Sequence, residues 1–283
     1  MKRIIYAVSV ALLAAGCNQE APSDVVLNDG ETLVHFRVTG DFDRPTFTRG
    51  DLSADGSDMT DLWVFDFVNE ECVQTLHLTP EDEDWGDPAI TMAHGEHNVC
   101  FVVSRGDEPV VDEDEQTITW SVPRDAFWGD LDLEVTQTTA PVAVTLDRVA
   151  TKLRLVATDA VPMNAKTVAA TPAKWYYGLN YWTGEPAGEQ TKERAVTIPT
   201  SYLGTSGQLV VSFFGISGTG EWFTDVVLRS KDASGNVIGS ATITAAPFKA
   251  NRATEYSGRL FTKEGSMDVT LNAEWLDAYT GTW

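Results

Sequence analysis

Alternating apolar and polar residues form the dominant pattern of this chain from residue 31 onward. In the first such segment, Val34, Phe36 and Val38 alternate with His35 and Arg37. Successive side chains of a β-strand point to opposite faces, so this pattern predicts a strand with one buried face. The 3.6-residue period of an amphipathic helix is almost absent, and the sequence therefore predicts an all-β protein.

Similar segments recur at short intervals in both halves of the chain. In the first half we expect strands at residues 34–38, 61–67, 72–78, 97–103, 117–122, 131–135 and 142–146. In the second half we expect strands at 152–157, 175–181, 194–198, 209–214, 223–229, 237–244 and 254–261. Seven short strands per half, separated by turn clusters, are typical of a β-sandwich. The sequence predicts two tandem β-sandwich domains, residues 31–148 and 149–265, that meet in a direct strand-to-strand passage near Arg148.

A further alternating segment follows the second predicted domain. Residues 268–275 place Val269, Leu271 and Trp275 on one face and polar groups on the other. We therefore predict a C-terminal strand extension at residues 266–283. Its apolar face needs a partner, which is either the second domain of the same chain or a neighbouring molecule.

The N-terminus has the features of an export signal. Lys2 and Arg3 precede an apolar run from residue 4 to 15, which is too short to span a bilayer core of about 30 Å. Residues 13–17 resemble the lipobox of bacterial lipoproteins, in which cleavage precedes the cysteine and the cysteine is acylated. We predict a signal peptide at residues 1–16, lipidation with palmitate at Cys17 and a polar tether at residues 17–30. The alternative is an ordinary secretory signal with an incidental cysteine.

The acidic charge is concentrated in the first half. Removal of residues 1–16 would leave 18 Lys and Arg against 42 Asp and Glu, a net charge of −24. Residues 17–148 contain 30 acidic residues, six Arg and no Lys, whereas residues 149–283 contain 12 acidic and 12 basic residues. A negative field of this size repels phosphate backbones, so nucleic acid is not an expected partner.

Two cysteines remain once Cys17 is lipidated. Cys72 and Cys100 could form a disulfide in an oxidising compartment, but both lie in apolar, strand-like segments where a cysteine also packs as a small hydrophobic residue. Sequence supplies no distance between them, so both interpretations stay open.

Other clusters of reactive or aromatic residues lack the spacing of a known site. Residues 94–97, His-Gly-Glu-His, lie near Cys100 but lack a zinc pattern, and Gly95 predicts a hairpin turn between residues 91 and 99. No nucleophile, base and orienting group come together, so we expect no catalytic site, no metal and no cofactor. An aromatic group forms either a glycan-binding platform or a strand covered on both faces; it comprises Trp175, Tyr176, Tyr177, Tyr181 and Trp182.

Segments spread over the whole chain carry a resemblance to one family. They are the lipobox at Cys17, residues 32–38 followed by Thr48-Arg49, the strand at 62–67, residues 152–156, Asn251-Arg252 before Tyr256, and residues 272–275 with a terminal Trp283. In order and spacing they resemble the fimbrillin-type proteins of the Bacteroidetes, and are slightly closer to the anchor branch. The resemblance implies a lipoprotein with two transthyretin-like β-sandwiches that builds or anchors a surface fimbria.

The resemblance also implies candidate sites. In shaft subunits of that family, a protease cuts after an arginine that follows the first strand, and the C-terminal strand of another subunit fills the vacated groove. The corresponding processing site here would be Arg49 or Arg44. The exchanging strands would carry Val34, Phe36 and Val38 at one end and Val269, Leu271 and Trp275 at the other. Anchor subunits keep their first strand and their lipid.

The expected function is therefore structural. The resemblance implies an anchor or accessory subunit at the cell outer membrane whose partners are other fimbrial subunits. The alternatives are a shaft or tip subunit activated by cleavage near Arg49, or a surface lipoprotein that binds a host or glycan ligand.

Replacement of Cys17 by alanine tests the predicted anchor. Because residues 18–30 contribute no alternating apolar segment, we expect Cys17→Ala to release the mature protein from membranes without lowering its melting temperature. Cell fractionation and thermal unfolding of the purified protein measure the two quantities. Retention of the variant in the membrane fraction at the wild-type level would contradict the lipid anchor.

Overall fold

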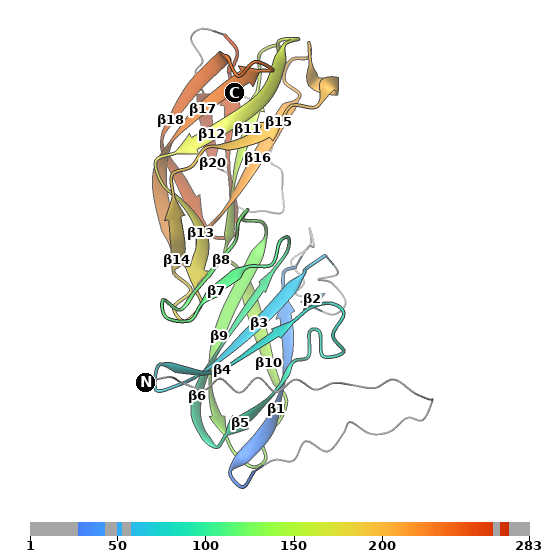
Figure 1. The fold of residues 1–283 in the computed structure, drawn as a ribbon, viewed down its shortest axis with the longest axis vertical. Coiled ribbons are helices and arrows are strands. Elements are labelled where there is room, and N and C mark those ends of the chain that lie inside the picture. Colours follow the sequence, from blue (N-terminus) through green and yellow to red (C-terminus); the bar gives the residue numbers. More distant parts are fainter. Residues whose placement is uncertain (1–27, 43–49, 53–57, 263–266, 272–283) are drawn as a thin grey trace, which may run out of the picture.

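The computed structural model describes residues 28–42, 50–52, 58–262 and 267–271. Nearly all of their regular structure is β-strand, with a 3₁₀ turn at Thr200–Tyr202. Figure 1 shows two lobes along the long axis of the molecule, one formed by the first half of the chain and the other by the second half. The predicted fold class, all-β with two β-sandwiches in tandem, is confirmed.

The first lobe contains one sheet that folds back on itself. Its strands are β1 (Glu31–Gly40), β2 (Gly50–Asp51), β3 (Asp61–Val68), β4 (Glu71–Leu78), β5 (Ala89–Ala93), β6 (Gly95–Ser104), β9 (Ala126–Val135) and β10 (Val142–Arg148). Strands β4, β3, β6 and β9 form one layer, and β10 and β1 with β5 and β2 form the other. The layers join at a corner where β9 and β10 pair only at Asp147↔Trp128 and Arg148↔Phe127. Between them lies a hydrophobic core that includes Phe36, Val64 and Phe101.

The first strand is an inner strand of its layer. Residues Glu31–His35 pair antiparallel with β5, and residues Phe36–Gly40 pair parallel with β10. Past the end of the β1–β5 pairing, the backbone N–H groups of Phe36 and Val38 donate hydrogen bonds to the carbonyl oxygens of Pro88 and Gly86 at 2.8 Å. Val34, Phe36 and Val38 are at most 1% exposed, as the alternation predicts.

The second lobe is a sandwich of two four-stranded sheets. One has the order β16 (Leu209–Ile216), β11 (Ala150–Ala157), β19 (Arg252–Gly258) and β20 (Met267–Leu271). The other has the order β15 (Arg194–Thr197), β12 (Ala165–Pro172), β17 (Glu221–Asp232) and β18 (Val237–Lys249). In each lobe the first strand pairs parallel with a later strand. Strand β1 pairs in this way with β10, and β11 pairs in this way with β19.

A fourth sheet joins the two lobes. It has the order β14 (Pro186–Gln190), β13 (Trp175–Asn180), β8 (Thr117–Thr119) and β7 (Val110–Asp112), so a hairpin from each half contributes two strands. The chain itself crosses directly, because β10 ends at Arg148 and β11 begins at Ala150. A separate hydrophobic core lies under this sheet, and in it the ring of Tyr181 stacks on that of Phe65 with centroids 3.8 Å apart. The predicted boundary at residues 148 and 149 stays a prediction, since strands from both sides share one sheet.

Local predictions differ from the structure in several places. The short or weakly alternating strands β2, β5, β7, β12 and β14 were not predicted. Strands β17 and β18 form a hairpin, and Gly235 has a φ of 84° in its turn. The predicted hairpin at Gly95 is wrong, because β5 pairs with β1 whereas β6 pairs with β3 and β9. The turn at His94 and Gly95 instead carries the chain from one layer to the other.

The β8–β13 pairing depends on a glycine. A Cβ atom at Gly178 would lie 2.2 Å from the carbonyl oxygen of Ile118 and 2.9 Å from the Cα of Thr119. We expect Gly178→Ala to lower the free energy of unfolding by about 1–3 kcal/mol, the usual cost of overpacking. Chemical denaturation measures the loss. Gly220→Ala is the matched control, because its Cβ would meet only the Ser217 carbonyl oxygen at 3.9 Å. Equal stability of the two variants would contradict a tight β8–β13 contact.

Candidate functional site

A groove lies on the outer face of the first lobe, next to the junction with the second. It has a volume of about 550 Å³. Strands β3, β6 and β9 form its floor, the turn between β3 and β4 forms one side, and Trp182 from the loop after β13 forms another. We call it the junction groove; its lining residues are Phe67, Asn69, Glu70, Glu96, His97, Asn98, Asp132, Leu133, Glu134 and Trp182.

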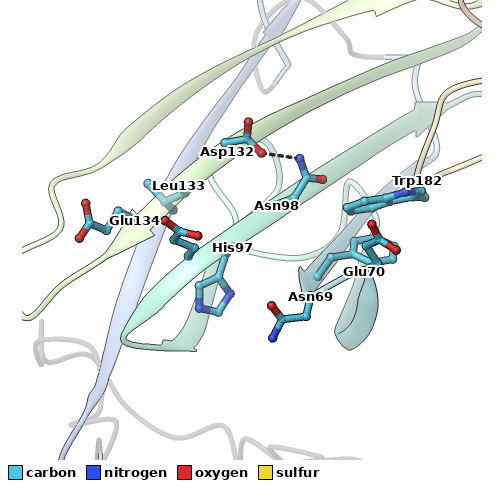
Figure 2. Close-up of a pocket in the computed structure, with 10 residues that line it drawn as sticks. Asn69, Glu70, His97, Asn98, Asp132, Leu133, Glu134 and Trp182 are labelled. Carbon is cyan, nitrogen blue, oxygen red and sulfur yellow. Dashed lines mark hydrogen bonds between the residues drawn. The ribbon is translucent and has the colours of Figure 1, made fainter.

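Strand register aligns the groove's central residues. Phe67 pairs with Asn98, and Asn98 pairs with Asp132, so these residues form a row across three strands. Asn98 Nδ2 donates to Asp132 Oδ1 at 3.0 Å, as Figure 2 shows. The Cys100 thiol lies 3.2 Å from Asn98 Oδ1 and can donate to it. The amide of Asn98 is therefore held in one orientation.

The second half of the chain supplies the aromatic wall. The backbone N–H of Trp182 donates a hydrogen bond to Asn180 Oδ1 at 3.0 Å, and the indole ring of Trp182 packs against the ring of Phe67 with centroids 4.4 Å apart. Its carbonyl oxygen lies 3.8 Å from the Cys100 sulfur. Trp182 remains half-buried, so part of its ring faces the groove. In Figure 2 it approaches the strands from a separate segment of the chain.

A buried ionisable pair lies beneath the groove. His97 Nδ1 is 2.7 Å from Asp66 Oδ1, and His97 Nε2 is 2.9 Å from the carbonyl oxygen of Ala93. Since a carbonyl only accepts, Nε2 carries a hydrogen, and one proton is shared between Nδ1 and the Asp66 carboxyl. Burial raises the pKa of Asp66 above its ordinary value, and the hydrogen bond and charge of His97 oppose that rise.

The groove is acidic and rich in hydrogen-bond acceptors. Glu70, Glu96, Asp132 and Glu134 line it, and no Lys or Arg does. Among the described residues, no group of His, Cys, Asp or Glu is arranged to hold a metal ion. The His-Gly-Glu-His segment does not converge either, because His94 contacts Thr32 Oγ1 at 3.0 Å whereas His97 faces Asp66.

In the structure Cys72 and Cys100 are free thiols, so the disulfide left open by the sequence is not formed there. Cys72 lies on β4 and Cys100 on β6, and β3 runs between these strands. Two interstrand spacings amount to about 9.5 Å, which exceeds the Cα separation that a disulfide can bridge. Burial raises the pKa of the Cys100 thiol, as Asp130 does to a lesser degree, so this cysteine packs as an apolar group.

Candidate assembly residues fall into two groups. Cys17, Arg44, Arg49 and Trp275 lie outside the described residues. Val34, Phe36 and Val38 lie on β1 inside the core, and Val269 and Leu271 lie on β20, whose backbone pairs antiparallel with β19 of the same chain. In this structure the C-terminal strand is thus an edge strand of its own second lobe.

The aromatic group does not form an exposed platform. Trp175 and Tyr177 are buried on one face of β13, and Tyr181 just after the strand is also buried, whereas Tyr176 on the other face is half-buried, so the strand is not fully covered on both faces. Only Tyr176 and Trp182 keep partial exposure. The sequence analysis therefore singled out Trp182, and also Glu96 and His97 within residues 94–97, but it contained no signal that these residues lie together with Asn98 and Asp132 in one groove.

Comparison with known proteins assigns the family. A family model, described as a family of unknown function (DUF6562), matches residues 110–282, which is more than half of the chain. The chain belongs to the DUF6562 family. The matched region begins at the first residue of β7 and so includes both hairpins of the sheet that joins the lobes. No curated protein sequence matches the chain significantly.

Solved structures share the fold of this DUF6562 chain. Two candidate adhesins of Bacteroides ovatus match with TM-scores of 0.53 and 0.51, at 10% and 12% identity. The matches cover 85% and 82% of this chain and 93% and 88% of theirs. A candidate adhesin of Bacteroides thetaiotaomicron matches with a TM-score of 0.50 at 10% identity, over 86% of this chain and 98% of its own. The fold implied by the family resemblance is thereby confirmed.

Among the residues that the structure covers, none of the helices combines the length and the apolar character required to cross a bilayer.

The His97–Asp66 pair predicts a pH-dependent loss of stability. His97→Ala leaves a buried carboxylate without its partner, which costs about 3–5 kcal/mol at pH 7. The variant raises the pKa of Asp66 further in the folded state. The added cost is therefore absent below the unfolded pKa of about 3.9 and grows as the pH rises above it.

Denaturation of wild type and variant at several pH values measures this effect. The double variant His97→Ala/Asp66→Asn lacks both titratable groups of the pair, so the pH-dependent loss expected for His97→Ala should disappear from it. The exposed His35→Ala is a second control. A loss of stability in His97→Ala that is equal at pH 3.5 and pH 7 would contradict the pairing.

Proposed function

We propose that the mature chain is a surface-exposed lipoprotein subunit of a fimbria, held at the outer membrane through Cys17, that binds other subunits by β-strand exchange. The observation that carries the proposal is the setting of β1. This strand is the first of the fold, has partners on both edges, and inserts a row of fully buried apolar side chains into the core.

The energetics of β1 suit strand exchange. Each of Val34, Phe36 and Val38 contributes roughly 1.5–3 kcal/mol when fully buried. Phe36 also packs edge-on against Phe101 with centroids 5.2 Å apart. In the shaft or tip alternative, loss of the strand would open an apolar slot between β10 and β5 with unpaired backbone groups on both sides, whereas an anchor keeps this slot filled. A strand of alternating apolar and polar residues from another molecule can fill the slot with its apolar side chains and form hydrogen bonds with the unpaired backbone groups.

Contacts just after β1 favour the anchor role over the shaft role. Phe42 is fully buried and packs edge-on against Phe127 with centroids 4.9 Å apart. Arg148 Nη2 donates to the carbonyl oxygen of Asp41 at 3.1 Å, while its Nε donates to Asp125 Oδ1 at 2.8 Å. These contacts hold the end of β1 to the body of the protein, as an anchor that keeps its first strand requires.

The C-terminal strand is the proposed donor. Strand β20 occupies the end of its sheet and pairs with β19 along five residues. An edge strand with one partner leaves its sheet at lower cost than an inner strand does, because fewer backbone hydrogen bonds must break. In a fibre, this strand would move from β19 to a neighbouring subunit.

Isolation of the protein from native membranes tests the assignment. After mild cross-linking and detergent extraction, we expect the affinity-tagged chain to co-purify with other β-sandwich surface subunits identified by mass spectrometry. Cys17→Ala is the control and should recover fewer of them in the membrane fraction. Recovery of the wild-type chain without any such subunit would contradict the fimbrial role.

The intact mass of the same sample separates the anchor from the shaft. An acylated N-terminus at Cys17 supports an anchor. A chain that begins after Arg44 or Arg49 supports the alternative of a shaft or tip subunit activated by cleavage.

Deletion of residues 263–283 tests strand donation. We expect the free energy of unfolding to fall by about 2 kcal/mol or less, since β20 is an edge strand, while recovery of partner subunits is lost. Thermal unfolding and the co-purification assay are measured on the same preparation. Unchanged recovery of partners together with a large loss of stability would mean that β20 serves only its own lobe.

A further inference from the structure

The junction groove has the position and size of a small-ligand site. Its volume of about 550 Å³ lies within the range of roughly 300–1,000 Å³ typical of ligand pockets, which occur preferentially between domains. Residues from both halves line it, and the hydrophobic core beneath the connecting sheet fixes the halves at this point. The groove is therefore formed before any ligand arrives.

Trp182 provides a flat apolar wall that is already oriented. Its backbone N–H is held by Asn180, and Phe67 supports its ring from behind. The preceding residue is also fixed, since the Tyr181 ring stacks on Phe65 and the Tyr181 carbonyl accepts a hydrogen bond from Trp128 Nε1 at 2.9 Å. A half-buried ring that already packs against Phe67 offers a surface for stacking at low entropic cost.

The polar side of the groove selects a ligand rich in hydrogen-bond donors. Its carboxylates, on Glu70, Glu96, Asp132 and Glu134, can only accept hydrogen bonds when ionised. Asn98 already uses one amide hydrogen for Asp132. Hydroxyl groups can donate to such acceptors, whereas sulfate, phosphate or carboxylate groups on a ligand would be repelled.

We propose that the junction groove binds an uncharged pyranose unit of a glycan. Trp182 stacks on the apolar face of the sugar ring, and Asp132, which lies in the same row of paired residues as Phe67 beneath that ring, accepts hydrogen bonds from its hydroxyls. The site goes beyond the proposed role in a fimbria and does not depend on assembly of a fibre.

The geometry favours a sugar over other ligands of this acidic groove. The floor strands β3 and β6 are paired along both edges, so they offer no open backbone edge to an extended peptide. The carboxylates of Glu96, Asp132 and Glu134 come from two neighbouring strands, and the structure gathers no group of them that could hold a metal ion. Asn98 and Asp132 continue the row of paired residues that begins at Phe67 beneath the Trp182 ring, so polar groups beside a flat ring match a sugar that carries several hydroxyls.

A glycan array followed by titration tests the proposal. The detergent-solubilised mature protein is applied to neutral, sialylated and sulfated saccharides, and the best neutral ligand is titrated by calorimetry. We expect binding to neutral saccharides only, with little change in affinity between about 50 and about 500 mM NaCl, because no ligand charge is involved. Trp182→Ala should weaken binding by about tenfold or more, and Trp182→Phe by less.

Matched variants separate binding from folding. Trp182 also packs in the junction core, so Asp132→Asn, which alters an exposed groove carboxylate, provides a second readout that does not disturb packing. We expect Asp132→Asn to weaken binding severalfold at an unchanged melting temperature. Phe223→Ala removes an aromatic ring that is 55% exposed outside the groove, and Glu189→Gln removes an exposed carboxylate elsewhere. Both should bind as wild type does.

Three results would overturn the proposal. They are absence of binding to any neutral saccharide, affinity that Trp182→Ala and Asp132→Asn leave unchanged, and salt-sensitive binding of a lysine-rich peptide that competes with the saccharide. The last result would assign the groove to a cationic protein partner instead.

Discussion

Packing between the two halves at the connecting sheet is the interaction on which the rest of the molecule depends. Strand β8 of the first half pairs with β13 of the second at Gly178↔Thr119 and two further positions, and Tyr181 stacks on Phe65 below them. The buried residues of this core come from both halves. Without this packing, the two lobes would be joined only by the backbone that crosses between them at residue 149. Here the lobes share a sheet and a hydrophobic core, so that the position of each depends on the other.

The same packing creates the polar surface features of the junction. Trp182 forms part of the groove only because Tyr181, next to it, is anchored in the shared core. Arg148 is the last residue of β10, where the chain passes into the second lobe. Its buried guanidinium donates hydrogen bonds to Asp125, to the carbonyl oxygen of Asp41 and to Asn251 of the second half. A buried guanidinium is tolerated when such partners satisfy its donors. The hydrophobic and the ionic contacts therefore hold the same junction from two sides.

Sequence alone predicted the strands whose alternation is strong, and missed those whose identity depends on distant partners. Val34, Phe36 and Val38 were recognised because burial of one face imposes period two. Strand β7 is three residues long, and β12 is rich in alanine, so neither carries a distinct pattern. Pairing is a property of two segments, and nothing in residues 117–119 specifies residues 178–180 as partners. For the same reason the predicted hairpin at Gly95 was wrong, the question of a disulfide between Cys72 and Cys100 stayed open, and nothing in the sequence showed that Trp182 and residues 96 and 97 lie in one groove.

The parallel pairing of β1 with β10 has a mechanical consequence for a protein tethered at its N-terminus. In the proposed lipoprotein the tether would lead into β1 at Glu31, and the chain leaves β10 at Arg148 for the second lobe. Tension between the tether and the second lobe would pull β1 toward its start and β10 toward its end. Because these strands run parallel, the two forces act in opposite directions along one ladder of hydrogen bonds. All bonds of the ladder would then share the load in shear, rather than opening one after another from an end.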